Sequence, residues 1–521
     1  MSSEQFRLII FHHHLLPGGV TDVIRHSVSS LSTMDAIESI TIVCGRADNT
    51  EKMESHLKQL EQKGRKLRIE LLPQLDYSGR PAASEDPEFL RKVLLEKYGS
   101  DHAVWLIHNY HLGKNWALTK ALNTIAETQS QRMIYQIHDF PECARYGNLK
   151  ELRTHINESL YPLSPSLRYC VINVRDYQIM KNAGMGENVI HLLENPVPAG
   201  DNPAGLKVDK EKLFTKLMQY KPADGRIAEG GDIWLYPVRS IRRKNVLEAG
   251  FLAALQEKPV NLILTLPGIS PQEKKYSDLC EKAFARGLIK GFWGTGALPD
   301  EAGISYREMI SAADLIFSPS VQEGFGYMYL NSLLWRKPLI ARSLDIMGGF
   351  LPLMNGYPAL FYKLVLVPGD SGLKKRTETG YRERFSELKN YLLPELEEKL
   401  ERELENYLAS DSLEFSYLSP EDQYRILEKL QDLSYRKECA DLNRTTLGKM
   451  ADLGSIPVRD KEKELYASYG EESYRQNFGK ILNSFSGTES SEFSNNRKDR
   501  KIDGALQLEF TKLEFLRLLY R

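Results

Sequence analysis

The stretch DLIFSPSVQEGFGYMYLN, residues 314–331, contains the local pattern on which the fold assignment rests. A short apolar run ends at Ser318 and Pro319, a turn with Glu323 and two glycines follows, and a segment with helical spacing begins directly after the turn. Short apolar runs bounded by proline and glycine are typical of buried strands. A strand that leads through a glycine turn into a helix is the repeating unit of a parallel α/β sheet.

The same alternation continues along most of the chain. In the first part the apolar runs are FRLIIF, SITIVCG, KLRIELL, AVWLIH, RMIYQIH and YCVINV, and each precedes a longer amphipathic segment. A second series consists of IWLYPV, VNLILTLPG, IKGFWG, DLIFSPS and KPLIAR. Such alternation predicts parallel sheets with helices on both faces. We therefore predict an α/β fold of two Rossmann-like, doubly wound domains that face each other across a cleft, where the carboxyl ends of the strands bind ligands.

Changes in composition divide the chain further. A stretch rich in proline, glycine and charge begins near residue 198 and separates the two α/β series, and a charged helical region follows the second series. The predicted parts are a first Rossmann-like domain at 1–197, a second at 198–369, a helical insertion at 370–465, a closing helix at 466–486, and a linker with a C-terminal element at 487–521. The last element is too apolar to stay exposed, so we expect it to pack against the rest of the chain.

Leucines recur at every fourth position of the helical region, at Leu388, Leu392, Leu396, Leu400, Leu404 and Leu408. Because a step of four exceeds the ~3.6 residues of a helical turn, this stripe winds around a helix and does not form a straight coiled-coil seam. Pro394 predicts either a kink or a helix start. Two alternatives remain for the leucines, a helical hairpin packed on its own domain or the interface of a homodimer.

Charge and cysteine content exclude several classes of function. The 521 residues include 69 basic and 70 acidic side chains, so no overall field would attract nucleic acid or an anionic membrane. The five cysteines are widely spaced, odd in number and without a C-x-x-C pair, which predicts buried thiols in a reducing compartment. The sequence lacks a signal-peptide pattern and a transmembrane segment. We predict a cytoplasmic protein with small-molecule partners.

The first apolar run leads into HHHLLPGGV, which offers two candidate features. Gly18 and Gly19 lie at a predicted helix start, where free N–H groups favour an anion such as a phosphate. Their spacing differs from G-x-G-x-x-G, which argues against a nicotinamide dinucleotide. Successive side chains of an extended segment point to opposite faces, so His12, His13 and His14 cannot all reach one ion and no metal site is predicted. They line a polar cleft or are ordinary surface or core histidines.

Polar residues also follow two later strands of the first series. His138 and Asp139 come directly after one strand, and the alternative to a cleft position for His138 is a core histidine paired with Asp139. The preceding strand of the series ends in the same way, with His108, His111 and Lys114 beyond it.

In the second series, Arg239 follows a strand and Lys244 lies near a predicted helix start. An arginine fork and a compact lysine charge can hold a diphosphate from two sides, although basic residues in a turn are more often solvated. In the 314–331 stretch, Glu323 can accept hydrogen bonds from hydroxyl groups beside the N–H groups of a helix start. This combination suits a phosphorylated sugar, and a purely structural turn is the alternative.

Taken in order, these stretches resemble the retaining glycosyltransferases of the GT-B fold, specifically family 4. The matching segments are LLPGGV, IHD, ENPV, VRSIRRKN and SPSVQEGFG with KPLIA, and the resemblance covers roughly residues 5–368 with YGEESYRQNFGKILNSF as the closing helix. It implies a retaining, metal-independent hexosyltransferase that uses a nucleotide-sugar and needs no cofactor. The first domain would then bind the acceptor and the second the donor.

The resemblance also implies roles for single residues. Arg239 and Lys244 would stabilise the leaving diphosphate, and His138 would contact the donor sugar near the reacting carbon. Glu323 would hold hydroxyl groups of that sugar. The further donor-binding residues would be Gly18, Gly19, Gly324, Phe325, Gly326 and Asn331. The configuration would be retained through attack on the same face, with the departing phosphate helping to take the acceptor proton.

The chain departs from the family pattern at Asn331, where the family has a second glutamate that reads the nucleotide ribose. Asparagine still bonds a hydroxyl, but it is neutral and offers fewer acceptor sites. Two other readings therefore stay open, a GT-B glycoside phosphorylase that uses inorganic phosphate and a non-catalytic GT-B scaffold. The helical insertion is a second departure from compact members.

The acceptor side of the first domain has its own pattern. Histidines and basic residues fall at or just past its strand ends, which predicts an electropositive surface in a neutral chain. We therefore expect an anionic acceptor, a sugar phosphate or a hydroxy acid. The predicted acceptor-binding residues are His108, Lys114, Asp139 and Arg145, and the histidines that contribute to this charge also include His12, His13, His14, His111 and His138.

Overall fold

The computed structural model describes residues 5–48, 51–61, 64, 66–200, 202–220, 226–388, 394–453, 456–486 and 496–519. The chain forms two compact units. The first comprises residues 1–199 and 464–511, and the second comprises residues 200–463 and 512–521. The chain therefore enters the second unit twice, once after Ala199 and again after Thr511.

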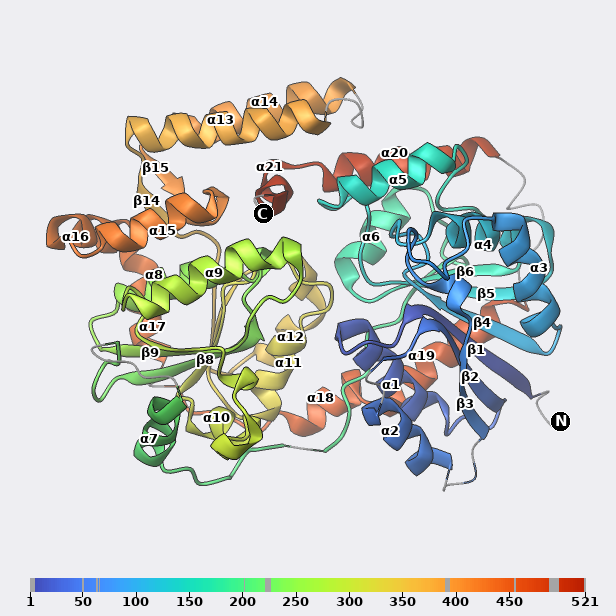
Figure 1. The fold of residues 1–521 in the computed structure, drawn as a ribbon, viewed down its shortest axis with the longest axis horizontal. Helices are drawn as coiled ribbons and strands as arrows, with labels where there is room; N and C mark the ends of the chain where they lie inside the picture. The colour runs from blue at the N-terminus through green and yellow to red at the C-terminus, as the bar shows by residue number, and fades with distance from the viewer. Residues whose placement is uncertain are drawn as a thin grey trace. The chain divides into compact units, whose positions relative to one another are not determined.

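The first unit contains a parallel sheet of seven strands in the order β3-β2-β1-β4-β5-β6-β7 (Figure 1). The strands are β1 (Phe6–His14), β2 (Ile37–Arg46), β3 (Lys66–Leu71), β4 (Ala103–His108), β5 (Arg132–Ile137), β6 (Leu167–Val171) and β7 (Ile190–Leu192). All six residues of β4 are buried, as expected for a central strand covered on both faces.

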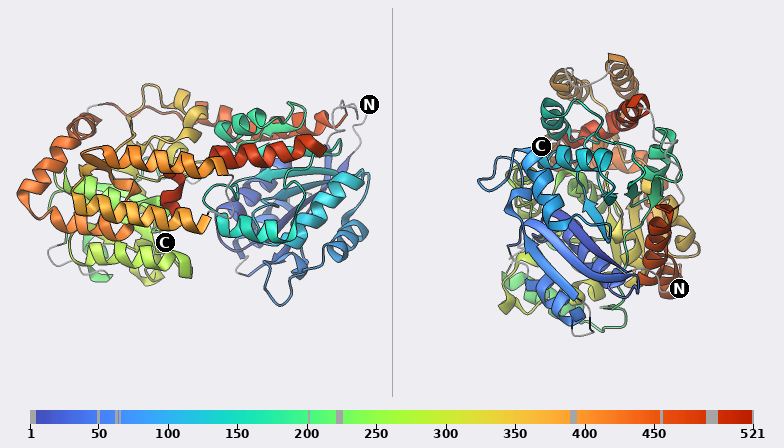
Figure 2. Two further views of the ribbon diagram at one scale, coloured as in Figure 1. Left: turned by 90° about the horizontal axis from the view of Figure 1, so that it is seen from above. Right: turned by 90° about the vertical axis from the view of Figure 1, so that its right-hand side faces the viewer.

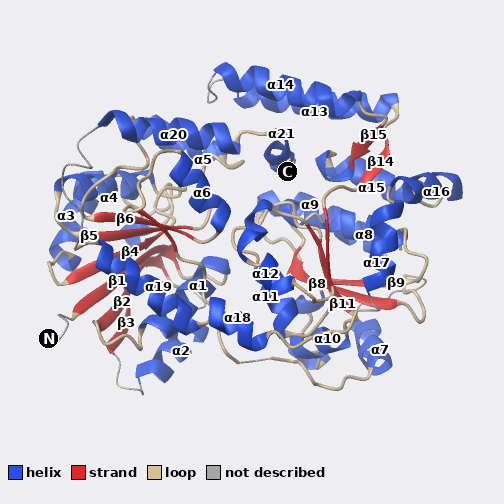
Figure 3. Ribbon diagram, turned by 180° about the vertical axis from the view of Figure 1, so that it is seen from behind, coloured by secondary structure: helices blue, strands red, loops and turns tan. Residues whose placement is uncertain are grey.

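Helices cover both faces of this sheet. α1 (Gly19–Leu31), α2 (Glu51–Glu61) and α19 (Glu471–Ser484) lie on one face, and α3 (Pro87–Tyr98), α4 (Trp116–Thr128) and α5 (Tyr146–His155) lie on the other (Figure 3). The first unit also contains α6 (Val174–Asn182), α20 (Asn496–Phe510) and, from Glu464 onward, α18 (Glu462–Tyr469). Arg168 of β6 fixes the end of α19, because its guanidinium donates to Ser484 Oγ at 2.9 Å and to the Ser484 carbonyl at 2.7 Å.

The second unit repeats the architecture with six parallel strands in the order β10-β9-β8-β11-β12-β13. The strands are β8 (Asp232–Arg239), β9 (Val260–Leu266), β10 (Gly291–Trp293), β11 (Leu315–Ser318), β12 (Leu339–Arg342) and β13 (Ala359–Tyr362). The flanking helices are α7 (Lys210–Tyr220), α8 (Val246–Ala254), α9 (Pro271–Ala285), α10 (Tyr306–Ala312), α11 (Tyr327–Leu334) and α12 (Leu351–Met354). The predicted α/β class with two Rossmann-like sheets is confirmed.

A helical region follows the second sheet. Its elements are β14 (Leu366–Pro368), α13 (Ser371–Leu388), α14 (Pro394–Ala409), β15 (Ser412–Glu414), the 3₁₀ turn η6 (Phe415–Tyr417), α15 (Pro420–Lys429), α16 (Leu433–Leu442) and α17 (Arg444–Asp452). Helices α13 and α14 pack against each other as a hairpin (Figure 2). Pro394 begins α14, which is one of the two alternatives that its position predicted. Leu388, Leu396, Leu400 and Leu404 are buried, whereas Leu392 lies outside the described residues.

The helical region shares its core with the second sheet. Leu413 and Phe415 belong to the same buried cluster as Leu247 and Phe251 of α8, and α15 packs on both α8 and α9. Phe251 and Phe415 stack with ring centroids 4.8 Å apart. This region is therefore an integral part of the second unit.

A buried ion cluster reinforces the attachment. The Arg342 guanidinium bridges Glu248 of α8 at 2.5 Å and Glu414 of β15 at 2.7 Å. Tyr362 donates to the Glu248 carboxylate at 2.9 Å, and the backbone N–H of Val365 donates to the Glu414 carboxylate at 2.7 Å. Buried charges are stable only when they are paired and hydrogen-bonded, so these contacts specify one packing of the region on the sheet.

All five cysteines are buried free thiols. Of the helices that the structure describes, none has both the length and the apolar character that a membrane span requires.

Candidate active site

In both sheets the strand order reverses between two central strands, between β1 and β4 in the first unit and between β8 and β11 in the second. In open α/β sheets the loops at the carboxyl ends of such strands form the ligand site, because they diverge to opposite faces there. Arg239 is the last residue of β8, and Glu323 lies in the loop after β11. The candidate donor residues therefore follow the two strands at the switch point of the second sheet.

A cluster of three ionised side chains joins these two loops. The Lys244 ammonium, from the 3₁₀ turn η2 (Arg242–Lys244) after β8, donates to one oxygen of the Glu323 carboxylate. Arg243 donates to the other oxygen at 3.2 Å. The Lys244 and Glu323 side chains are only 13% and 11% exposed, so this pair is largely withdrawn from water.

Hydrogen bonds around the cluster fix the loops. The hydroxyl of Tyr236 in β8 donates to the Lys244 carbonyl at 2.9 Å and lies 2.6 Å from the Ser320 hydroxyl. The backbone N–H of Val321 donates to the Arg243 carbonyl at 2.9 Å. These hydrogen bonds therefore hold the loop after β8 and the loop after β11 together.

The charges shift the pKa values of the two central groups. Burial alone would raise the pKa of Glu323, but the Lys244 ammonium and the Arg243 guanidinium outweigh it and lower this pKa to about 2. Glu323 is therefore a carboxylate at neutral pH. Burial lowers the pKa of Lys244 to about 8 against the opposing influence of Glu323, and Arg243 adds to the decrease. Lys244 thus titrates within reach of ordinary assay conditions.

The remaining basic residues of this loop differ in environment. Arg239 is 36% exposed, and its guanidinium is 3.8 Å from the Glu273 carboxylate. Arg242 is buried and donates to the Ser416 carbonyl at 2.7 Å, so it attaches the helical region to the loop. Arg239 is open to a ligand, whereas Arg242 serves the fold.

The glycine turn before α11 has structural reasons of its own. Gly326 precedes the helix with φ 90°, and a Cβ atom there would lie 2.6 Å from the Tyr329 ring. Phe325 is buried edge-on against Phe350, with ring centroids 5.6 Å apart. Gly324 precedes them in the loop, and Asn331 lies partly buried in the second turn of α11. The fold therefore demands Gly326 and Phe325 irrespective of any ligand.

Gly18 and Gly19, at the start of α1, differ from Gly326 because a side chain at either position would meet no steric clash. A Cβ atom on Gly19 would meet nothing within 4 Å, and one on Gly18 would meet only the Leu16 carbonyl at 3.8 Å. The φ of Gly18 is 172°, which any residue adopts. The packing of the first unit therefore does not require glycine at either position.

Five histidines of the first unit lie at the carboxyl ends of β1, β4 and β5. His12, His13 and His14 end β1, His108 ends β4 and His138 follows β5. The rings of His108 and His138 are nearly parallel, and His108 Nδ1 lies 2.8 Å from His138 Nε2. His13 Nδ1 lies 3.0 Å from the Leu75 carbonyl, and His14 Nε2 lies 2.9 Å from the Tyr77 hydroxyl. Each of these contacts orients a ring at the sheet edge.

These histidines are neutral at physiological pH. Burial lowers the pKa of His13 to about 4 and that of His138 to about 4, and it lowers the pKa of His12, His14 and His108 as well. His111 lies in the core among Tyr110, Phe140 and Tyr161, and burial lowers its pKa to about 3. The expectation that histidines make the acceptor side electropositive is therefore wrong. The sequence could not reveal how deeply these rings are buried.

The positive charge at this edge comes from lysine and arginine. The Lys114 ammonium lies 5.0 Å from the centre of the Tyr77 ring, and Arg46 Nε lies 3.7 Å from the Asp76 carboxylate. Arg145 pairs with Asp139 at 3.0 Å, and the three cations are partly exposed. Sequence reasoning identified Lys114, Asp139 and Arg145 but missed Arg46 and Tyr77. Arg46 ends β2 beside His14 and could have been found by its strand-end position, whereas Tyr77 lies in a long loop without such a signal.

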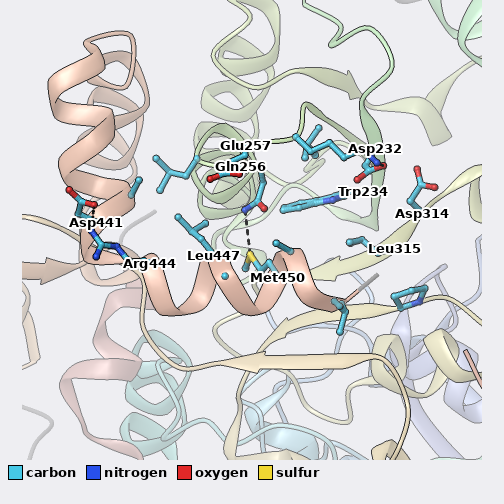
Figure 4. A pocket seen from close by; sticks show the side chains of 18 residues that line it. Asp232, Trp234, Gln256, Glu257, Asp314, Leu315, Asp441, Arg444, Leu447 and Met450 are labelled. Atoms are coloured by element: carbon cyan, nitrogen blue, oxygen red, sulfur yellow. Dashed lines mark hydrogen bonds and ion pairs between the residues drawn. The ribbon is translucent and has the colours of Figure 1, made fainter. Parts of the chain in front are cut away.

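A cavity of about 1030 Å³ in the second unit lies away from these residues, and Figure 4 shows side chains that line it. It is bordered by Asp232, Val260 and Leu315, which begin β8, β9 and β11, and by residues of α17. It therefore occupies the amino edge of the sheet, opposite to the edge that carries Arg239. In the part of the chain that the structure describes, no three His, Cys, Asp or Glu side chains are arranged to hold a metal ion.

Comparisons with known proteins identify one relative in sequence and several in fold. No protein-family model matches the chain. Mannosylglucosyl-3-phosphoglycerate synthase of Petrotoga mobilis is 32% identical over 438 residues, which cover 82% of each protein. Among solved structures, sucrose-phosphate synthase of Thermosynechococcus elongatus aligns with a TM-score of 0.51 at 12% identity, over 92% of this chain and 98% of that one.

The fold and the sequence relationship lead to one assignment. The structural alignment with sucrose-phosphate synthase supports the architecture, and the identity with the Petrotoga synthase extends over most of both proteins. The chain belongs to the same family as this synthase, the family 4 type of GT-B glycosyltransferases, and it is a glycosyltransferase.

Proposed function

We propose that the protein is a retaining, metal-independent hexosyltransferase that moves a sugar from a nucleotide-sugar to a small anionic acceptor of the glycosyl-phosphoglycerate kind. The observation that carries the donor half of this proposal is the ion cluster of Lys244, Arg243 and Glu323 at the switch point of the second sheet, in which Lys244 and Glu323 are largely buried. The acceptor half is supported by the name of the Petrotoga relative, whose product contains 3-phosphoglycerate.

Donor binding would break the ion pair between Lys244 and Glu323 and give each side chain a new partner. A buried ammonium and a buried carboxylate each need a partner. The diphosphate of the donor would replace Glu323 as the partner of Lys244, with Arg239 on its open side, and the sugar hydroxyls would replace Lys244 as donors to Glu323. The peptide N–H groups of Gly324, Phe325 and Gly326 would add to this grip, Asn331 would bond a ribose hydroxyl, and Gly18 and Gly19 would admit the diphosphate from the first unit.

In the reaction the bond between the sugar carbon and the phosphate oxygen breaks, and a bond to the acceptor oxygen forms on the same face of the sugar. Because the new bond forms on the face from which the phosphate leaves, the configuration is retained, and the departing phosphate oxygen takes the acceptor proton. Lys244 and Arg239 would stabilise the charge that develops on the diphosphate, a task that a metal ion performs elsewhere. His138, neutral because of its burial, would contact the sugar near the reacting carbon.

The acceptor would bind at the carboxyl edge of the first sheet. Lys114, Arg145 and Arg46 supply three positive charges near Tyr77. In the structure Arg145 pairs with Asp139, and Arg46 lies 3.7 Å from both Asp76 and the exposed Asp48. A ligand with phosphate and carboxylate groups would pair with these cations. His108 orients His138 through its ring contact and would line the acceptor side.

A thermal-shift panel of nucleotides, nucleotide-sugars and sugar phosphates tests the donor assignment. We expect one nucleoside diphosphate and its sugar conjugate to raise Tm, because a ligand at a hundred times its Kd stabilises the native state by about 2.7 kcal/mol. The shift should shrink in Lys244→Ala. Stabilisation by sugar phosphates or inorganic phosphate alone, with no response to any nucleotide, would contradict the proposal and favour phosphorolysis.

A further inference from the structure

The last residues of the chain connect two functional loops. α20 belongs to the first unit, whereas α21 (Leu513–Leu516) and the 3₁₀ turn η9 (Arg517–Leu519) belong to the second. We propose that this C-terminal segment, residues 496–519, is a strap that couples the acceptor-side loop after β5 to the donor-side loop after β11, with Arg517 as the positioning residue at its second end.

The first end of the strap is anchored on the loop that follows His138. Phe510 is fully buried and stacks on Phe140, with ring centroids 4.9 Å apart. Thr511 lies 3.4 Å from the Tyr146 hydroxyl. Phe140 follows Asp139 and Tyr146 follows Arg145, so the strap contacts the loop between β5 and α5 near both of its ends.

A second contact fixes α20 in place. The Asp503 carboxylate accepts from the Ser159 hydroxyl at 2.6 Å and from the Leu160 N–H at 3.2 Å, and it pairs with Arg153. Ile502 and Leu506 are buried one turn apart on the same helix. An ion pair and a buried apolar face therefore fix α20 to the first unit.

The second end of the strap holds the loop that carries Glu323. Arg517 is only 6% exposed and donates to the Val321 carbonyl at 3.4 Å and to the Ser416 hydroxyl at 2.6 Å. Its guanidinium also lies over the Tyr417 ring, 4.9 Å from the centre. Val321 stands two residues before Glu323 and is bonded on its other side to Arg243. Arg517 thus restrains the loop after β11, the same loop that Lys244 and Arg243 contact at Glu323.

Burying the Arg517 guanidinium costs free energy of folding, which suggests a functional reason for its position. Among the described residues no carboxylate lies within salt-bridge distance of it, and its Nε is buried without a hydrogen-bond partner. A buried cation without a counter-charge destabilises a fold, and sites that retain such costs are often functional. Only seven positions separate Arg517 from Phe510, so a displacement at one anchor is transmitted to the other along a short, packed segment. Occupation of the acceptor side would in this way favour the donor-binding arrangement of Glu323.

A double-mutant cycle on the donor KM tests the strap. Arg517→Met should raise the donor KM about tenfold with a smaller change in kcat, and Arg517→Lys should restore part of the loss. Phe510→Ala should also raise the donor KM, although its contacts lie on the first unit. The double variant should be little worse than either single variant, because each releases the same segment.

Phe478→Ala serves as the matched control, since Phe478 is a fully buried aromatic residue of α19 in the first unit. It should lower Tm without changing the donor KM. A donor KM that stays at the native value in Phe510→Ala, or effects that add in the double variant, would overturn the strap. The inference presupposes a nucleotide-sugar donor, and native enzyme that transfers no sugar would contradict the proposed function instead.

Discussion

Among the residues of the proposed donor site, Lys244 allows the sharpest test. Its ammonium is buried, bonded to Glu323 and placed at the switch point of the second sheet. If it stabilises the leaving diphosphate, Lys244→Ala should lower kcat by about 10²- to 10³-fold, the usual cost of removing one preorganised charge at a transition state. Steady-state kinetics at saturating donor would measure this.

Lys258→Ala is the control for that measurement. Lys258 lies at the opposite edge of the same unit, is 65% exposed and pairs with Asp232. Its loss should leave kcat unchanged. Near-native turnover in Lys244→Ala would remove this lysine from the proposed mechanism.

The pH dependence follows from the same lysine. Burial lowers the pKa of Lys244 to about 8, so the ammonium is present below that pH and is lost as the pH rises through it. The kcat/KM for the donor reports groups of the free enzyme and should fall above about pH 8. In Lys244→Arg the side chain remains charged throughout this range, so the alkaline decrease should disappear even if activity is reduced. An unchanged alkaline limb in that variant would assign the titration to another group.

The helical region after β14 is an element whose role the sequence left open between two alternatives. The structure attaches it to α8 and β12 through the Arg342, Glu248 and Glu414 cluster and through a common apolar core. A homodimer interface along the leucine stripe remains a prediction, and the buried leucines of α14 leave little of that stripe for a partner.

Glu414→Ala tests whether this element is integral. The substitution removes one partner of a buried guanidinium and leaves the N–H groups of Val365 and Ser416 without their acceptors. We expect the free energy of unfolding of the second unit to fall by about 2–4 kcal/mol, measured by denaturant titration. Glu405→Ala, on the exposed side of α14, should change it by less than ~0.5 kcal/mol. Equal effects of the two substitutions would mean that the cluster does not stabilise the attachment.

The elements also show what could be read from the sequence. The parallel strands were predictable because short apolar runs and glycine turns report burial and chain reversal directly. Arg239, Lys244 and Glu323 were predictable because strand-end positions fix them at one edge of a sheet. The roles of Arg242 and Arg517 were not, since their partners Ser416 and Val321 are distant in the chain.

The distribution of charge over the whole molecule was also only partly predictable from the sequence. The chain has a formal net charge of −1, and the sequence predicted an electropositive surface at the first sheet from histidines together with Lys114 and Arg145. Burial keeps these histidines neutral, so the positive charges are those of Lys114 and Arg145, which were predicted, and of Arg46, which was not. The number of cationic residues was visible in the sequence, but desolvation of each ring depends on packing that no local pattern encodes.

Transfer to matched acceptors tests the central claim most directly. With the nucleotide-sugar found by thermal shift, kcat/KM should be measured for a glycosyl-3-phosphoglycerate and for its dephosphorylated counterpart, with a chelator present and the product configuration determined by NMR. The account predicts a retained configuration, no loss of rate with the chelator, and a preference of about 10- to 100-fold for the phosphorylated acceptor, as charge-assisted bonds to Arg46 and Lys114 would give. Equal efficiency with both acceptors, or an inverted product, would contradict it.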